Sequence, residues 1–548
     1  MTLFNFIYNT IRARVNNPSN ARFWLPKVLE NIEGSNNNKL LPLKTNEFNV
    51  GVIDGEGGTT ITNSFKTQYD SYLEHVEGVN LDNQTAIACP KTPNPSLSFK
   101  TMELDGLQNL WVLADPPTTS GTFGYNTIIN LETNYYDGVT HLPAVPMLKI
   151  KGNYLLAQNF CTADIGANTC NGNYSTNING TGYVDLSINN GLIEADTKID
   201  IKGTGVNRSL NVIVNKVTFK GITASSKPTL KINDLKIIAN VSDFLKGVWI
   251  EMSTKAINHP ETQVSIFSQI NATLNTTENL TKLSETMTSQ LHKAINGILG
   301  NLPPGQLPDD SGQKLANPVD LYIFDRIRFG FNDPTSSTYI PLTISNINSP
   351  ILDPLQIDKI SLPNQDVMGL TAKDIKVENI NFDGLTNVIA PSNQVIFNTS
   401  TEMTATLNIG DIKNSSKLSN GKTIPLPPLK GKGNFSLSID GQTLTGGFNV
   451  SVSSSQFSFK TVITGDDVST MVVTLNAANL IAAPNAVTID IDIASFFEKT
   501  INQVINKDDI KNKIISAINS ELSNNLASIS QEITKVSRTS INNRLKNN

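Results

Sequence analysis

Two copies of one pattern, Leu104-Asp-Gly-Leu-Gln-Asn-Leu110 and Phe382-Asp-Gly-Leu-Thr-Asn-Val388, stand in the two halves of the chain. Each copy is followed by a proline-containing run that leads into Lys-Gly-Asn and an aromatic residue: Leu142-Pro-Ala-Val-Pro-Met-Leu-Lys-Ile-Lys-Gly-Asn-Tyr-Leu155 and Ile424-Pro-Leu-Pro-Pro-Leu-Lys-Gly-Lys-Gly-Asn-Phe-Ser-Leu437. Asp105 precedes Gly152 by 47 positions, and Asp383 precedes Gly433 by 50. The same order at nearly the same spacing predicts a tandem duplication.

Extended sequence surrounds both copies, and each half closes with helical sequence. Alternating apolar and polar residues, as in Asn211–Phe219 and Leu230–Ile238, predict antiparallel strands. Apolar residues three and four apart then predict long amphipathic helices over 262–300 and 494–545. The helix residues expected to line an apolar trough against the sheets are Leu283, Met287, Leu291, Ile295, Ile514, Ile518, Leu522 and Leu526.

These patterns predict an α+β fold with two tandem units in an elongated molecule. Each unit is a long, highly curved antiparallel β-sheet wrapped on a long amphipathic helix. The expected divisions are an N-terminal helical and β extension at 1–100, a first unit at 101–300, a connector with strands at 301–376 and a second unit at 377–548. Helical spacing of apolar residues also predicts a short helix over 2–15.

The predicted unit leaves apolar surface to be covered. A helix is only ~10 Å wide, whereas a long curled sheet is wider. The remaining trough would take another helix, the sister unit or a ligand. An elongated apolar trough suits acyl chains, because each buried methylene contributes about 0.8 kcal/mol.

This duplicated sheet-and-helix pattern resembles the tubular lipid-binding (TULIP) superfamily. The resemblance covers roughly residues 101–548, and it is carried by the repeated segments quoted above and the helices over 262–300 and 494–545. Among bacterial members the chain is similar to the accessory proteins of clostridial toxin clusters, the OrfX type. The resemblance implies a lipid or other apolar ligand held in a groove. The toxin-cluster relatives further imply toxin-cluster protein partners and toxicity to insects or other animal hosts.

The composition excludes several classes of protein. Charged residues make up 17% of the chain, and the net charge is −5. A nucleic-acid binder needs clustered Lys and Arg for its phosphate contacts, so no nucleic-acid partner is expected. About one residue in eight is Asn. We expect Asn, Ser and Thr to cover the outer faces of the sheets and helices.

Targeting signals and a disulfide framework are also not expected. The N-terminal sequence lacks the apolar core and cleavage site of a secretory signal, which predicts a protein that is cytoplasmic as made and is released or exported by a non-classical route. The sequence contains no run of ~18 consecutive apolar residues, so no membrane-spanning helix is expected. Cys161 and Cys170 could pair in an oxidising setting, but three cysteines, the third being Cys89, favour reduced packing residues.

The chain shows no pattern of residues typical of an enzyme. Its four histidines lack the spacing of metal ligands, and no nucleophile elbow or phosphate-binding loop occurs. We therefore expect no catalytic residue, metal or cofactor. His292 is expected on a helix surface, and Asp490 and Asp492 on the solvated face of a strand.

Four aromatic residues are candidates for membrane contact or lipid entry, with core packing as the favoured alternative: Trp111, Trp249, Phe496 and Phe497. Three functions stay open at this point. The protein is a lipid- or hydrophobe-binding component acting with toxin partners, a scaffold of a toxin or secretion assembly with a filled groove, or a membrane-active toxin component that uses its amphipathic C-terminal helix. An enzyme is the least favoured class.

Overall fold

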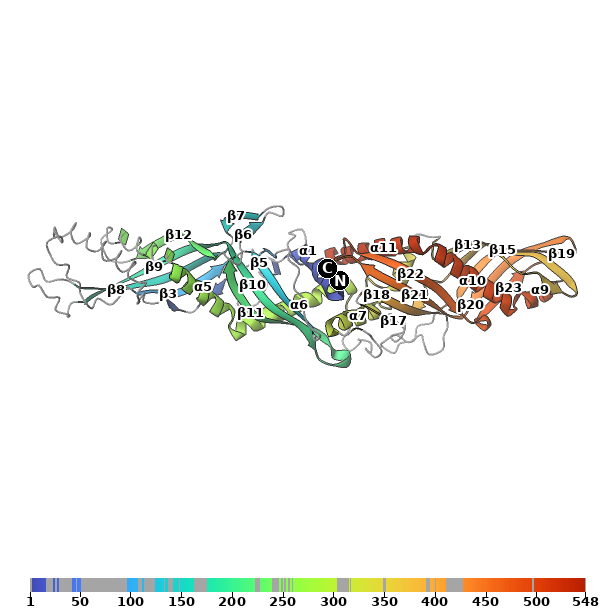
Figure 1. Ribbon diagram of the computed structural model, residues 1–548, viewed down its shortest axis with the longest axis horizontal. Helices are drawn as coiled ribbons and strands as arrows, with labels where there is room; N and C mark the ends of the chain where they lie inside the picture. The colour runs from blue at the N-terminus through green and yellow to red at the C-terminus, as the bar shows by residue number, and fades with distance from the viewer. Residues whose placement is uncertain are drawn as a thin grey trace, which may run out of the picture.

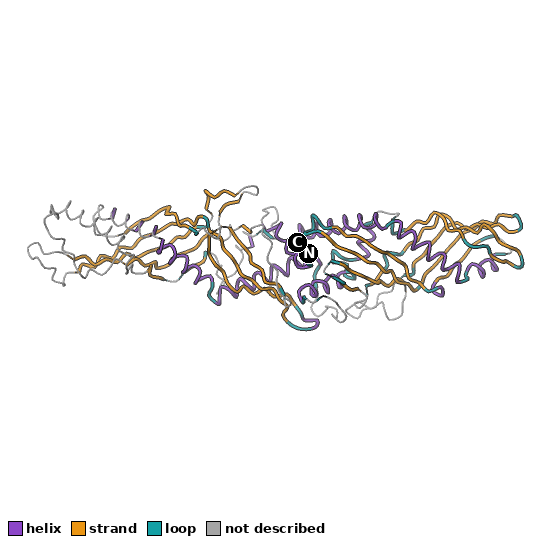
Figure 2. Tube along the Cα trace, in the orientation of Figure 1, coloured by secondary structure: helices purple, strands orange, loops and turns teal. Residues whose placement is uncertain are grey.

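The computed structural model shows one elongated molecule, with the first half of the chain at one end and the second half at the other (Figure 1). The described residues are 2–15, 23–24, 27–28, 42–45, 47–50, 96–106, 111–112, 124–132, 134–136, 141–146, 148–161, 175–221, 227–238, 246–247, 250, 253–254, 257–258, 260–302, 315, 317–347, 351–390, 395–399, 401–410, 427–494 and 497–547. The expected α+β class with antiparallel sheets is confirmed: strands dominate the described chain and all their pairings are antiparallel (Figure 2).

Two sheets form the first half. Their strand orders are β1-β3-β8-β9-β12, with β2 also paired to β3, and β11-β10-β5-β4. The short strands β6 and β7 pair only with each other among the described residues. In chain order the strands are β1 Leu43–Lys44, β2 Phe48–Val50, β3 Ser96–Asp105, β4 Trp111–Val112, β5 Tyr125–Glu132, β6 Asn134–Tyr136, β7 His141–Pro146, β8 Lys149–Cys161, β9 Ser175–Asn189, β10 Gly191–Lys202, β11 Ser209–Gly221 and β12 Thr229–Ile238.

Two sheets of the same order form the second half. They are β13-β15-β19-β20-β23, with β14 paired to β15, and β16-β18-β21-β22, with β17 paired to β18. The strands are β13 Leu355–Ser361, β14 Gln365–Val367, β15 Leu370–Asp383, β16 Val388–Ile389, β17 Val395–Phe397, β18 Glu402–Gly410, β19 Leu429–Ile439, β20 Gln442–Val452, β21 Ser454–Thr464, β22 Val472–Ala482 and β23 Val487–Asp492. The halves thus share strand order as well as the sequence patterns.

The repeated patterns occupy equivalent places in the two halves. Asp105, the last residue of β3, pairs with Lys149 of β8, and Asp383, the last residue of β15, pairs with Lys430 of β19. A glycine follows each aspartate with a positive φ, 93° in one half and 110° in the other, which the absence of a Cβ permits. In both halves, therefore, the strand ends at the aspartate and a glycine with positive φ follows directly.

The helices are shorter than the sequence predicts. The region 262–300 contains α5 Pro260–Leu274 and α6 Thr277–Leu299, with the Thr276 side chain capping α6. The region 494–545 contains α9 Glu498–Ile505, α10 Asp508–Asn524 and α11 Leu526–Asn547. The long helix expected over 494–545 is therefore divided into three. Asn525 ends α10, and its side chain donates to the carbonyl oxygen of Glu521.

Polar helix residues hydrogen-bond the free backbone edge of β11. Asn271 accepts from the N–H of Phe219, Ser284 from that of Val214 and Thr288 from that of Val212. Helix residues four apart are separated by ~6 Å and strand residues two apart by ~6.6 Å, so successive helical turns meet successive outward N–H groups. These residues, with Asn275 and His292, are called the polar ladder.

The second half has its own polar ladder along β22. Asn519, Ser530 and Thr534 accept from the N–H groups of Leu480, Leu475 and Val473. On α9, Asn502 and Asn506 pair in the same way with the edge strand β23. The expectation that Asn, Ser and Thr cover the outer faces of the sheets and helices therefore describes only part of their role. Many lie half-buried between helix and strand, where they satisfy a backbone edge that would otherwise be open to pairing with another chain.

The stretch expected to be a connector takes part in both halves. It contains α7 Pro318–Gly330 and α8 Ile340–Ser345, and its strands β13 and β14 already pair with β15. The predicted division at 376/377 falls inside β15, because short strands in a Pro- and Asn-rich stretch show little alternation. Likewise β1 and β2, in the expected extension, pair with β3.

Helix α7 joins the two halves. The buried Asp325 carboxylate contacts Arg208, from the turn between β10 and β11, and Arg328 on its own helix, each at 2.8 Å. Its neighbour Arg326 hydrogen-bonds the carbonyl oxygen of Gly300 at the end of α6. The main hydrophobic core accordingly continues from the second half into α1 Leu3–Val15, the end of α6 and α7.

Candidate functional site

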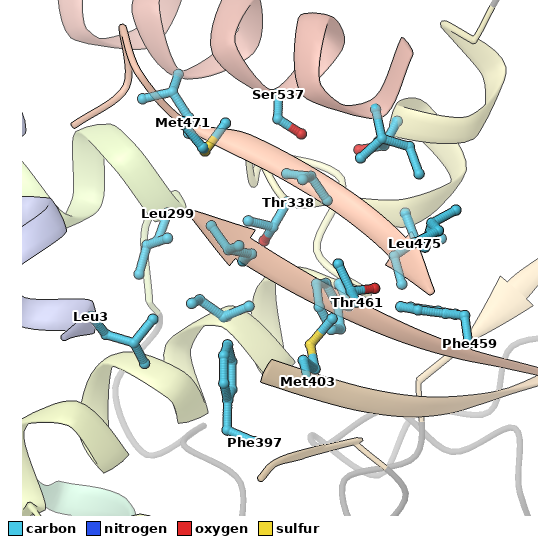
Figure 3. A pocket seen from close by; sticks show the side chains of 18 of the residues that line it. Leu3, Leu299, Thr338, Phe397, Met403, Phe459, Thr461, Met471, Leu475 and Ser537 are labelled. Atoms are coloured by element: carbon cyan, nitrogen blue, oxygen red, sulfur yellow. The ribbon is translucent and has the colours of Figure 1, made fainter. Parts of the chain in front are cut away.

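An apolar cavity of about 200 Å³ lies in the second half where it meets α1, α6 and α7 (Figure 3). Its walls come from the sheet β18-β21-β22, from α11 and from the helices α1, α7 and α8. The volume exceeds the ~150 Å³ of an engineered cavity that binds benzene. It therefore has room for a small apolar molecule or for a segment of a longer chain.

The sheet side of the cavity follows from strand alternation. Phe457, Phe459, Thr461 and Ile463 occupy every second position of β21, so their side chains share one face. In the neighbouring strand β22, Val473 and Leu475 are also two positions apart, and both side chains line the cavity.

The helix side follows from the four-residue spacing of α11. Ile529, Ile533, Ser537 and Ile541 lie one turn apart on one face of that helix and line the cavity together.

Helix α1 closes one side of the cavity with Leu3, Phe6 and Ile7. Two buried contacts hold α1 in place. The N–H of Phe4 donates to Asp320 Oδ1 at 3.0 Å, and the Phe4 ring stacks on the Tyr125 ring at 4.5 Å between centroids. Further along, Thr10 accepts from the N–H of Val468, and Arg14 donates to Asn542 of α11.

A buried acid supports this closure. Burial raises the pKa of Asp320 above its ordinary value, and the hydrogen bonds from Tyr125 and the N–H of Phe4 partly oppose that shift. Burial, and the hydrogen bond to Asp320, also raise the pKa of Tyr125. The Tyr125 hydroxyl donates to Asp320 Oδ2 at 2.5 Å. The pair binds α1 to α7 and to β5, and neither residue lines the cavity.

The cavity lining is uncharged among the described residues, and its polar groups are few. The hydroxyl of Thr343 donates to the carbonyl oxygen of Tyr339 at 2.9 Å, and that of Thr338 bonds Ser336. Thr461 differs, since its Oγ1 is buried and has no hydrogen-bond partner in the described structure.

The eight groove residues expected from sequence lie beside this cavity rather than in its lining. Ile295 and, on α10, Ile514, Ile518 and Leu522 are buried in the core. The other four are half-buried: Leu283, Met287, Leu291 and Leu526. The cavity lining begins one turn beyond the last predicted residue of each stripe, at Ile298 after Ile295 and at Ile529 after Leu526. The role of the eight residues as ligand contacts stays a prediction.

The four aromatic candidates are only partly placed. Trp249 and Phe496 lie outside the described residues, and Trp111 lies in β4. Phe497 precedes α9, is half-buried and packs against the main core. Its position favours the packing alternative.

Other sequence expectations have mixed outcomes. Asp490 and Asp492 are exposed on β23, as expected. His292 was expected on a helix surface. Its ring is instead half-buried, and its Nε2 lies 2.9 Å from the carbonyl oxygen of Leu210. Cys89 and Cys170 lie outside the described residues, so pairing of Cys161 stays untested.

Metal sites and membrane-spanning helices are not found in the described part of the chain. There, no three His, Cys, Asp or Glu side chains gather closely enough to hold a metal ion. Within the same residues, no helix has the length and apolarity needed to cross a membrane.

A second, open groove of about 790 Å³ runs between β11 and α6. It is lined by the polar ladder residues Ser284, Thr288 and His292, together with Glu285 and Lys293. Its lining mixes apolar residues with the charged Lys202, Glu285 and Lys293, which makes it less suited to an apolar ligand than the uncharged cavity.

Comparisons with known proteins leave the family open. No protein-family model matches the chain, and no curated protein matches its sequence. Takeout 1 of Epiphyas postvittana aligns at 14% identity over 44% of this chain and 93% of its own, with a TM-score of 0.22. A lipopolysaccharide binding protein aligns at 9% identity over 88% of this chain and 92% of its own, with a TM-score of 0.18. Both scores are below 0.5, so neither alignment carries an argument about this chain.

Proposed function

We propose that this protein binds a small apolar ligand, or the apolar part of a lipid, in the cavity between β18-β21-β22 and α11, and that its role is binding rather than catalysis. The observation that carries the proposal is the cavity itself: about 200 Å³ lined by uncharged, mostly apolar side chains. Each methylene transferred from water into such a site contributes about 0.8 kcal/mol, so a chain of six or seven carbons would gain roughly 5 kcal/mol before ordering costs.

Filling the cavity tests the proposal. Ala478 of β22 lines the cavity and is buried, whereas its neighbour Ala477 points to the other face of the strand and does not line it. We expect the full chain to retain n-heptane, measured by headspace gas chromatography. Ala478→Leu should weaken retention and Ala477→Leu should leave it unchanged. No retention by the parent protein, or equal retention by both variants, would contradict the proposal.

A scaffold with a filled groove is the second candidate. Burial of Ile514, Ile518 and Leu522 in the main hydrophobic core favours it for the part of the second unit around α10. On this alternative the cavity is a packing defect. It predicts that the Ala478→Leu variant is more stable and assembles as before, with no ligand to lose.

We further propose that the halves are duplicated tubular units of the TULIP type. The shared strand order and the matched pairing of Asp105 and Asp383 support this. The toxin-cluster partners, insecticidal role, peripheral membrane contact and non-classical release stay predictions from the sequence resemblance and the N-terminal sequence. Co-purification of partner proteins would test the toxin-cluster partners, and dye release from liposomes would test the membrane contact.

A further inference from the structure

The buried hydroxyl of Thr461 has no hydrogen-bond partner in the described structure although it lies in the cavity wall. The side chain is 3% exposed, so water outside the protein does not reach it. In Figure 3 it lies among the apolar side chains of Met403, Phe459 and Leu475. A buried hydroxyl without a partner is costly, because it loses its bonds to water and gains none.

The equivalent threonine in the first half shows the alternative arrangement. Thr197 follows a register shift in the pairing of β10 with β11, between Asp196 and Thr197, just as Thr461 follows one in the pairing of β21 with β22. The N–H groups of their strand partners, Val214 and Leu475, each donate to a serine of the polar ladder in the same half, Ser284 and Ser530 respectively.

The two hydroxyls nevertheless differ in their bonding. Thr197 Oγ1 donates to the carbonyl oxygen of Thr127 at 2.9 Å, so it is satisfied within the sheet. The equivalent strand partner of Thr461 is Met403, and among the described residues Thr461 Oγ1 has no hydrogen bond to it or to any other group. The same backbone geometry thus allows the hydroxyl of Thr197 to hydrogen-bond within its sheet. The hydroxyl of Thr461, at the cavity, makes no such bond in the described structure.

We propose that the ligand of this cavity is a neutral amphiphile whose single oxygen function, a hydroxyl or carbonyl, hydrogen-bonds to Thr461 Oγ1. This inference rests on the proposed apolar-ligand function and specifies the chemical class. A hydroxyl can both donate and accept, so it serves an alcohol, ketone or ester equally. A carboxylate or ammonium group is excluded, because the described lining holds no charge to pair with it.

A matched pair of probes separates the hydrogen bond from apolar burial. 1-Hexanol and n-heptane have the same number of heavy atoms and differ in one terminal hydroxyl. The affinity of the full chain for each is measured by headspace gas chromatography, and the ratio of the two affinities is compared between variants. Thr461→Val keeps the shape of the side chain and removes its hydroxyl.

We expect Thr461→Val to lower the hexanol-to-heptane affinity ratio about threefold to tenfold, the range of one neutral hydrogen bond. Thr461→Ser should restore the ratio. Thr343→Val, in the same cavity, should leave it unchanged, because that hydroxyl already bonds Tyr339. Thr461→Val should also fold as stably as the parent, whereas Thr197→Val should not.

The outcomes are distinguishable. If both probes bind and Thr461→Val leaves the ratio unchanged, Thr461 is not the anchor and the inference fails while apolar binding stands. If neither probe binds the parent protein, the proposed function fails and the inference fails with it.

Discussion

The side chain of Asn275 pairs with the backbone of Val217 as a neighbouring strand would. Its Oδ1 accepts from the Val217 N–H at 2.8 Å, and its Nδ2 donates to the Val217 carbonyl oxygen at 2.6 Å. Asn519 pairs with Leu480 in the same way, at 2.6 and 3.1 Å. An amide side chain carries a donor and an acceptor in the arrangement of a peptide group, so asparagine on a helix can complete a sheet edge.

Removing this pairing should destabilise the first half. We expect Asn275→Ala to lower the free energy of unfolding by about 1–3 kcal/mol, because it leaves a half-buried N–H and C=O without partners. Urea denaturation followed by circular dichroism measures the change. Asn512→Ala, at an exposed position of α10, is the control. Equal effects of the two substitutions would show that the ladder contributes nothing specific.

The sequence predicts the strands and helix stripes well, because these depend on local periodicity. Ile266, Ile270 and Leu274 are buried on α5, and the repeated Asp-Gly segments end equivalent strands. The sequence does not indicate the polar ladder, because polar residues such as Ser284 and Thr288 at helical spacing are typical of a solvent-exposed helix face. Their partners lie in β11, some seventy residues earlier in the chain.

The cavity was missed for a different reason. Its closing helices come from segments assigned to an extension and a connector, and only tertiary packing brings Ile7 and Ile323 to the same wall. One local signal was available. Asn317 before Pro318 is a typical helix start, and its side chain indeed accepts from the N–H of Val319. No periodicity, however, indicates that α7 lines one cavity together with β21 and β22.

The polar ladder contains a titratable member. Burial lowers the pKa of His292 below its ordinary value of 6.5, and the charge of Arg326 lowers it further, while the hydrogen bond to Leu210 opposes the shift. The folded state therefore prefers the neutral ring. Its contribution to stability is present above pH 6.5 and is lost as the pH falls below that value.

We expect the stability difference between the parent and His292→Gln to shrink on acidification from about pH 7.5 to pH 5, because Gln keeps an N–H donor for Leu210 and does not titrate. Paired urea titrations at each pH give the difference. A difference that is flat across this range would mean that His292 titrates as it does in the unfolded chain.

Asp320 should show the opposite dependence. Its pKa is raised from 3.8 by burial, so the folded state holds its proton to higher pH than the unfolded state does. The stability advantage of the parent over Asp320→Asn should therefore be largest below pH 3.8 and should fall as the pH rises through the folded pKa, with a slope of at most about 1.4 kcal/mol per pH unit. Asn can still accept from the N–H of Phe4. Thermal unfolding of both proteins across the acidic range measures this, and an advantage that grows with pH would contradict it.

Helix α1 should set the size of ligand that the cavity accepts. Ile7 lines the cavity and is 2% exposed, whereas Ile11, one turn later, packs against the core without lining it. Ile7→Ala would enlarge the cavity at the α1 wall at a cost of about 2–5 kcal/mol in folding stability. We expect it to raise the affinity for n-nonane relative to n-heptane.

Ile11→Ala is the matched control, because it removes the same atoms from the same helix away from the cavity. Circular dichroism first establishes that both variants are folded at the temperature of the binding measurement. A nonane-to-heptane ratio that rises in Ile7→Ala and not in Ile11→Ala would place the bound ligand against α1. The same rise in both variants would instead indicate that loosening α1 exposes apolar surface generally, and would contradict a ligand site bounded by Ile7.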